Sequence, residues 1–202
     1  AWGVDDERYV ELAAVEDWEA VTASKYAQGL ELLKPAIDRL PGPGLLTFAV
    51  HVPDARSTAA RLRAAGHDVV EDEVRFEEKD AGFVEVYVRD MPPHFPFFIT
   101  YDPPRAEIAK MRADYRAAEG ITLDERPDLV ALLARSEHPE VEVQLLADLI
   151  GCPVQGSTVA LPGAEIRFEE GEPSGLYGIA VRGLAPIVRP TEIAGMTVHP
   201  ET

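Results

Sequence analysis

Apolar and polar positions alternate along much of the chain in the manner of β-strands. Residues 83–89 read Phe-Val-Glu-Val-Tyr-Val-Arg, which places Glu85 and Tyr87 on one face of a strand. Residues 97–101 likewise place Phe97 and Tyr101 together. The predicted strands span residues 9–13, 45–52, 69–76, 83–89, 97–101, 129–134, 158–161, 165–168, 176–181 and 193–198.

Helical patterns separate these strands. The predicted helices lie within residues 16–39, as one or two helices, and at 58–65, 107–118 and 141–150. Asp54 or Ser57 can cap the N-terminus of the helix at 58–65. Gly66 follows that helix, and Gly151 follows the helix at 141–150, as C′ residues do. The run of Pro and Gly at residues 41–44 marks the first clear boundary.

The order of elements occurs twice. A strand, a break, a helix and a glycine lead into another strand at residues 45–69, and the same order recurs about 85 residues later. The alternative is that any α+β protein shows this order twice by chance. The repeat predicts a βαβββ module at 44–103, a helical connector at 104–127 and a βαβββ-like module at 128–202.

Composition narrows the class of protein. The 202 residues carry a net charge of −17, which repels nucleic acid and anionic membranes and favours a neutral or weakly cationic ligand. The single Cys152 excludes an intramolecular disulfide and a cysteine-based zinc site, and fits a reducing compartment. No apolar run approaches the ~20 residues needed to span a bilayer. We therefore expect a soluble, cytoplasmic protein, and because the sequence starts with Ala1 we expect the natural chain to begin upstream.

Several stretches resemble glyoxalase-like domain proteins of the vicinal oxygen chelate superfamily, which includes glyoxalases, bleomycin-resistance proteins and extradiol dioxygenases. They are Tyr-Val-Glu-Leu at 9–12, residues 48–54 running into 59–66, Pro-Phe-Phe-Ile at 96–99, and residues 149–154. The resemblance implies an α+β fold in which βαβββ modules form curled mixed sheets around a cup. It also implies that residues 1–40 hold only the late strands of an incomplete first module, plus connecting helices. A homodimer that completes the cup is expected.

The resemblance supplies candidates for one divalent metal ion. Glu11 stands where the family often has a metal-binding glutamate, so it is a candidate metal ligand and catalytic residue; the alternative is a solvated carboxylate. Thr47 stands where the family has a metal-binding histidine. His51, two alternations further on, could be a ligand to the metal or to a substrate, or a satisfied histidine at the end of a strand.

Other residues could contact a small molecule. Glu85 could be a ligand or general base if burial raises its pKa, and Tyr87 and Tyr101 could be polar contacts, although core packing is the alternative for these aromatic residues. His94 lies in a loop among aromatic residues and could line a pocket or simply be exposed.

Three functions fit this chain. The first is a small-molecule binding protein without a complete metal triad, motivated by Thr47 and by the lack of histidine at 129–134. The second is a metal-dependent lyase, isomerase or dioxygenase that uses Glu11. The third is a structural or interaction module. Phosphate-binding, dinucleotide-binding, zinc-protease and serine-hydrolase motifs are absent from the sequence.

Overall fold

The computed structural model describes residues 2–3, 8–121, 127–183 and 188–201, which divide between two compact units. Unit 1 comprises Ala1–Trp2, Val10–Arg39 and Thr47–Ile121, and unit 2 comprises Gly3–Tyr9, Leu40–Leu46 and Thr122–Thr202. The short strands β1 (Trp2–Gly3) and β2 (Tyr9–Val10) form a two-stranded sheet.

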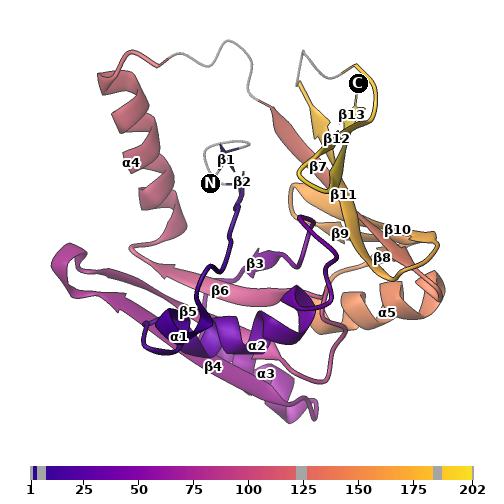
Figure 1. Cartoon of the computed structure of the whole chain (residues 1–202), viewed down its shortest axis with the longest axis horizontal. Helices are drawn as coiled ribbons and strands as arrows, with labels where there is room; N and C mark the ends of the chain where they lie inside the picture. Colours follow the sequence, from indigo (N-terminus) through magenta and orange to yellow (C-terminus); the bar gives the residue numbers. More distant parts are fainter. Residues whose placement is uncertain (1, 4–7, 122–126, 184–187, 202) are drawn as a thin grey trace. The chain divides into compact units, whose positions relative to one another are not determined.

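Unit 1 is built on a four-stranded sheet in the order β3-β6-β5-β4 (Figure 1). Its strands are β3 (Ala49–His51), β4 (Val69–Phe76), β5 (Ala81–Val88) and β6 (Phe97–Asp102). Its helices are α1 (Trp18–Thr22), α2 (Ala27–Ile37), α3 (Ala55–Ala64) and α4 (Arg105–Ala118), and the 3-10 turn Glu77–Lys79 joins β4 to β5. Strands β3 and β6 are parallel, and the other neighbours are antiparallel.

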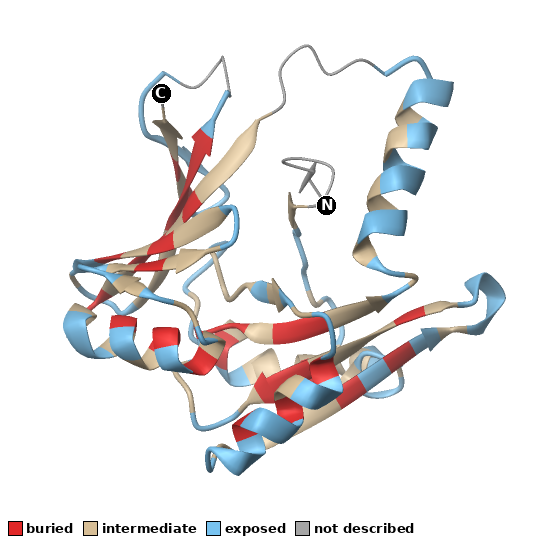
Figure 2. Cartoon of the chain, turned by 180° about the vertical axis from the view of Figure 1, so that it is seen from behind, coloured by how far each residue is buried: buried red, intermediate tan, exposed pale blue. Residues whose placement is uncertain are grey.

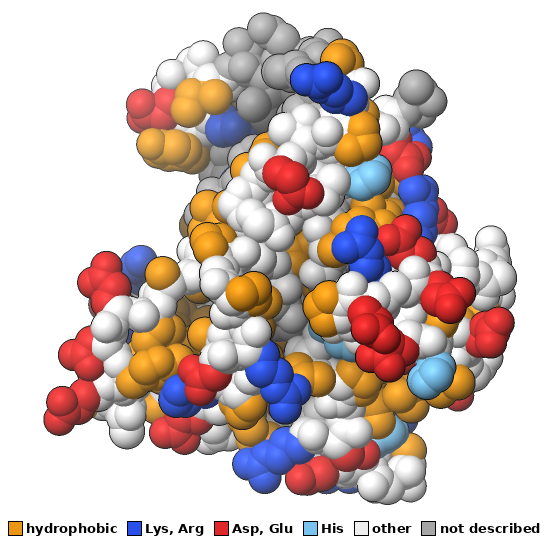
Figure 3. All heavy atoms as spheres, turned by 45° about the vertical axis from the view of Figure 1, so that its right-hand side comes forward, with side chains coloured by type: hydrophobic (Ala, Val, Ile, Leu, Met, Phe, Trp, Pro, Cys, Tyr) orange, Lys and Arg blue, Asp and Glu red, His pale blue; other side chains and the backbone are white. Residues whose placement is uncertain are grey.

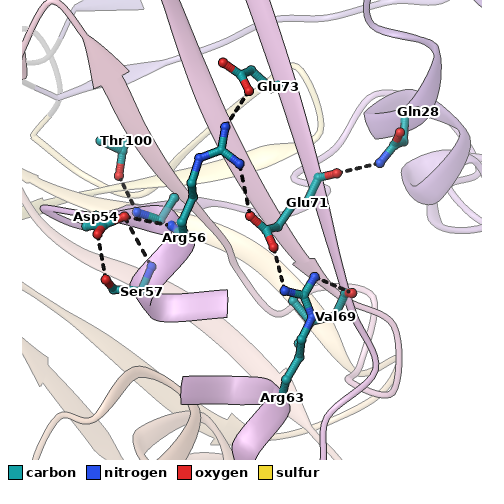
Figure 4. Close-up of polar contacts among 10 residues, drawn as sticks. Gln28, Asp54, Arg56, Ser57, Arg63, Val69, Glu71, Glu73 and Thr100 are labelled. Atoms are coloured by element: carbon teal, nitrogen blue, oxygen red, sulfur yellow. Dashed lines mark hydrogen bonds and ion pairs between the residues drawn. The ribbon is translucent and has the colours of Figure 1, made fainter. Parts of the chain in front are cut away.

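Helix α3 covers one face of this sheet. Its buried residues Ala55, Ala59 and Leu62 form a stripe at helical spacing, which packs against β4, β5 and β6. The Asp54 carboxylate accepts hydrogen bonds from two backbone N–H groups of the first turn. Thr100 of β6 accepts the Ala55 N–H at 2.8 Å, so the helix begins where the sheet holds it (Figure 4).

Ion pairs fix α3 along β4 on the same face. Arg63 contacts Glu71 at 2.5 Å, and Arg56 contacts both Glu71 and Glu73 (Figure 4). Glu71 and Glu73 therefore lie on the α3 side of β4. Because strand side chains alternate, Asp72 lies on the opposite side.

Unit 2 is built on a seven-stranded sheet in the order β12-β13-β11-β7-β10-β9-β8 (Figure 1). Its strands are β7 (Asp128–Ser136), β8 (Val154–Gln155), β9 (Thr158–Leu161), β10 (Ala164–Glu170), β11 (Gly175–Arg182), β12 (Thr191–Ile193) and β13 (Met196–Glu201). Helix α5 (Pro139–Ile150) ends at Gly151, which adopts a left-handed conformation with φ of 80°.

The core of unit 2 lies under α5. The buried α5 residues Val143, Leu146 and Leu149 face the sheet, and α5 contacts β7, β8, β9 and β10. Ile166 of β10 and Ile179 of β11 are also fully buried, so the apolar alternation of these strands supplies the other half of the core. Figure 2 shows the buried residues of both units along the strands and on one side of α3 and α5.

The predicted fold class is confirmed: the chain is an α+β protein of repeated modules with curled mixed sheets. In unit 1 the order is β3-α3-β4-β5-β6 with β3 parallel to β6, and in unit 2 it is β7-α5-β8-β9-β10 with β7 parallel to β10. In the part of the chain that the structure describes, no helix is both long and apolar enough to traverse a membrane.

Three predicted strands were wrong in extent. The predicted strand 9–13 is shortened to the two residues Tyr9–Val10 of β2. The predicted strand 45–52 shrinks to Ala49–His51, whose partner β6 starts only at Phe97. The predicted strand 193–198 is two strands, because Ala194 and Gly195 have positive φ and turn the chain back on itself.

Candidate functional site

The face of the unit 1 sheet opposite α3, here called the Glu85 face, carries most of the predicted site residues. Cross-strand partners lie on the same face, and the register pairs Asp72 with Glu85, Glu85 with Ile99, and Ile99 with His51. Alternation then places on this face the aromatic and polar residues Phe83, Tyr87, Phe97 and Tyr101. The prediction that Glu85 and Tyr87 share a face is therefore confirmed.

A compact polar group, here called the Glu85 cluster, occupies the middle of this face. It consists of Glu85, Tyr87, Asp72 and Gly29 of α2. The Tyr87 hydroxyl donates a hydrogen bond to Glu85 Oε2 at 2.7 Å. The Gly29 N–H, in the first turn of α2, donates to Asp72 Oδ2 at 3.1 Å, so the Asp72 carboxylate satisfies a free donor at the helix N-terminus.

Burial dominates the electrostatics of the cluster. The pKa of Glu85 is raised from 4.5 to about 7, mainly because burial desolvates the carboxylate; the Tyr87 hydrogen bond lowers the pKa, and the charges of Asp72 and Glu11 add smaller increases. Desolvation and the Glu85 carboxylate together raise the pKa of Tyr87 far above its usual range. Glu85 is thus a carboxyl group whose charge changes near neutral pH, beside a tyrosine that stays protonated.

Helix α2 approaches the cluster closely because residue 29 has no side chain. A Cβ at Gly29 would lie 2.7 Å from Tyr87 Oη, 3.3 Å from Asp72 Oδ2 and 3.4 Å from Glu85 Oε2. Gln28 of the same turn donates to the Glu71 carbonyl at 2.7 Å. Glycine is therefore the residue that lets the helix N-terminus meet the three polar side chains.

Aromatic rings surround the polar group. Tyr87 stacks on Phe97 with centroids 5.2 Å apart, and His51 stacks on Tyr101 at 6.2 Å with an interplanar angle of 12°. Tyr87 is buried, Phe97 and Tyr101 are half-buried, and His51 is exposed. The face thus combines flat apolar surfaces with a few convergent polar groups, which is the usual make-up of a small-molecule site.

The other predicted site residues lie elsewhere. Glu11 lies beyond the end of β2 and is exposed, although its charge reaches Glu85. His94 is buried in the β5–β6 loop, with its ring edge-on to Phe95 at 5.2 Å, so the alternative of an exposed loop histidine is wrong. Thr47 donates from Oγ1 to the Phe95 carbonyl at 2.7 Å and thereby ties the segment before β3 to that loop.

The described residues do not offer a complete set of metal ligands. Thr47 uses its hydroxyl on a backbone carbonyl, and Glu11 is not in a strand. Nowhere in residues 8–121, 127–183 and 188–201 do three or more His, Cys, Asp or Glu side chains gather in a way that could hold a metal ion. The described residues therefore do not fit the divalent metal ion that the resemblance implies.

Sequence reasoning missed Asp72 and Gly29. A signal for Asp72 exists: it stands between Val70 and Val74, at a position where the alternation of the strand predicts an apolar side chain. A polar residue on an apolar face needs a partner, and α2 provides it. Gly29 could be noticed only as a glycine inside a helix, which gives no indication of what the helix approaches.

The surface around the described units is mixed in charge. Figure 3 shows acidic and basic side chains interspersed with apolar ones over one side of the molecule. The net charge of −17 means that acidic groups prevail over the whole sequence. At the Glu85 cluster, the charged groups that shift the Glu85 pKa are the carboxylates of Asp72 and Glu11.

Comparisons with known proteins agree with this fold. The sequence matches the family described as a glyoxalase-like domain over residues 2–150. The structure is similar to a crystal structure of a hypothetical protein from Staphylococcus aureus, with a TM-score of 0.71 and 15% sequence identity over 93% of this chain and 78% of that chain. At that identity the similarity shows the fold alone. No curated protein matches the sequence.

Proposed function

Because this chain belongs to the glyoxalase-like domain family, we propose that it binds a small organic molecule on the Glu85 face of the unit 1 sheet. The observation that carries the proposal is the Glu85 cluster itself. A largely buried carboxyl group and a buried tyrosine hydroxyl meet beside partly exposed aromatic rings, in a region rich in negative charge.

The chemistry of the cluster defines the ligand class. Asp72 already accepts a backbone N–H, and Tyr87 donates to Glu85. Glu85 can still accept a hydrogen bond from a ligand when it is ionised, and it can donate one when it is protonated. A flat ligand with a neutral or positively charged hydrogen-bonding group would lay its ring against Phe97 or Tyr101 and its polar group at Glu85.

Benzylamine and benzyl alcohol provide a matched pair of probes, one positively charged and one neutral. Titration calorimetry on the full chain at pH 8 should show that benzylamine binds, because most Glu85 side chains are then ionised. At pH 6 the ionised fraction falls to about one tenth, so the affinity should fall about tenfold. Benzyl alcohol, the neutral analogue, should show much weaker pH dependence.

Two variants locate the site. Glu85→Gln should lower benzylamine affinity at least about tenfold, since a hydrogen bond to a charged group is lost. Glu73→Gln is the control, because Glu73 lies on the α3 side of the same sheet and contacts Arg56. Equal benzylamine affinity in the wild type and in Glu85→Gln, or the same loss in both variants, would contradict the proposal.

A further inference from the structure

An open cavity of about 370 Å³ lies on the seven-stranded sheet of unit 2. Its volume is within the ~300–1,000 Å³ range of small-molecule pockets. The charged residues that line it are Asp128, Glu165, Arg167, Arg182 and Glu201. All but Asp128 lie beyond residue 150, outside the region that matches the glyoxalase-like domain. This cavity, here called the Arg167 cavity, is distinct from the Glu85 face, which belongs to unit 1.

Apolar residues lie close to these charged side chains. The register pairs Glu165 with Ala131 and Arg167 with Leu133, so these side chains share the face of the sheet opposite α5. Ala131, Leu133 and Ala180 form a buried apolar cluster there. Val130, which packs against this cluster, and Ala164 line the cavity itself, so the cavity has a small apolar part among its charged side chains.

Arg167 connects two strands that are not neighbours. Its Nε donates to Glu165 Oε1 at 2.5 Å on its own strand β10, and its Nη1 donates to Glu201 on β13. Strands β7 and β11 lie between β10 and β13. Adjacent strands are about 4.8 Å apart, so a direct contact over three strand spacings requires the sheet to curl toward this face. The ion pair between Arg167 and Glu201 thus crosses a concave surface.

The local charge balance depends on Glu201. Asp128 is paired with Arg8 at 2.5 Å and with Arg182 at 3.2 Å, and Glu165 is paired with Arg167. With Glu201 in place, these three arginines face three carboxylates. If Glu201 moved away, one positive charge would remain in excess, centred on the Arg167 guanidinium.

We propose that the Arg167 cavity binds a small monocarboxylate with an apolar body, and that the carboxylate of this ligand takes the place of Glu201 on Arg167. The guanidinium group matches a carboxylate in shape and charge, and Glu165 holds it in position. The apolar body lies against Val130 and Ala164, the apolar residues that line the cavity. Exchange is feasible because about a third of each paired side chain is exposed, at 35% for Arg167 and 27% for Glu201, and such ion pairs contribute little.

The test uses benzoate and its uncharged analogue benzamide on the full chain, by titration calorimetry in a buffer without carboxylates. Glu201→Gln should bind benzoate about fivefold more tightly than the wild type, because the internal competitor loses its charge. Arg167→Gln should lose more than about tenfold in affinity. Benzamide should bind both forms weakly and equally.

Glu169→Gln is the matched control. Glu169 is also on β10 and is paired with an arginine, Arg135 at 2.8 Å, but it does not line the cavity. Its benzoate affinity should equal that of the wild type. The proposal is overturned if Glu201→Gln binds benzoate no more tightly than Glu169→Gln, including the case in which neither binds. Glu85→Gln should leave benzoate binding unchanged, so failure here is distinguishable from failure at the Glu85 face.

Discussion

Replacing Gly29 with alanine would place a methyl group against the Glu85 cluster. The new Cβ would lie 2.7 Å from Tyr87 Oη, a separation too short for a carbon and a hydroxyl oxygen. Tyr87 cannot easily retreat, because its ring stacks on Phe97 and its hydroxyl is bonded to Glu85. Either α2 moves away from the sheet or the Tyr87–Glu85 hydrogen bond breaks.

Two effects of opposite sign determine how much Gly29→Ala changes the free energy of unfolding. In an exposed helix, exchanging glycine for alanine stabilises by about 1 kcal/mol. Overpacking a tight contact costs about 1–3 kcal/mol. We therefore expect Gly29→Ala to lower the free energy of unfolding by about 1 kcal/mol. In a Tyr87→Phe background the nearest atom is gone, and the same change should be neutral or stabilising by up to about 1 kcal/mol.

The assay is a double-mutant cycle by urea unfolding, followed by circular dichroism, at one pH. The cycle should give a coupling free energy between positions 29 and 87 of about 1–2 kcal/mol. A coupling near zero, with Gly29→Ala stabilising both backgrounds equally, would refute the close approach of α2 to Tyr87. That outcome would also remove the physical basis of the Glu85 cluster.

Two further predictions concern stability. The pKa of Glu85 is raised in the folded state, so the stability that its protonated form contributes is present below about pH 4.5 and is lost as pH rises through about 7. Relative to Glu85→Gln, the wild type should lose about 3 kcal/mol of unfolding free energy over this range, and a constant difference would contradict the assigned burial. In unit 2, a Cβ at Gly195 would lie 1.7 Å from the Pro43 carbonyl oxygen, whereas Gly156, also at positive φ, has nothing within 4 Å. Thermal melts should show that Gly195→Ala is clearly less stable than Gly156→Ala. Gly156→Ala bears only the ~1–2 kcal/mol cost of a left-handed backbone conformation, whereas Gly195→Ala also has the clash. Equal melting temperatures would mean that residues 40–46 do not pack against Gly195.

Local patterns were sufficient to predict the elements that build the fold. The alternation in residues 83–89 gave both the strand β5 and the shared face of Glu85 and Tyr87. Gly151 predicted the end of α5, because glycine adopts the left-handed conformation at a helix end more easily than other residues do. The repeated order of elements gave the βαβββ modules. Each of these features depends on residues close together in the sequence.

Features that depend on distant partners were not predictable in this way. The length of β3 is set by where β6 begins, which residues 45–52 do not encode. The contact of Gly29 with Asp72 joins residues 43 positions apart, and the ion pair of Arg167 with Glu201 joins residues 34 apart. Such contacts follow from sheet order and curl, so the candidate site could be predicted as a set of strands but not as a set of contacts.

The raised pKa of Glu85 also links ligand binding to stability, and this link separates a ligand contact from a purely structural carboxyl group. A cation that binds only the ionised form should stabilise the protein more at pH 8 than at pH 6, because the ionised fraction changes about tenfold around a pKa of about 7. At saturating benzylamine, the stabilisation at pH 8 should therefore exceed that at pH 6 by about 1.4 kcal/mol. Thermal or urea unfolding with and without benzylamine measures this difference, and Glu85→Gln should abolish it. A Glu85 carboxyl group with a purely structural role, as the partner of Tyr87, would give the same benzylamine effect at both pH values, since its ionisation would not depend on the ligand.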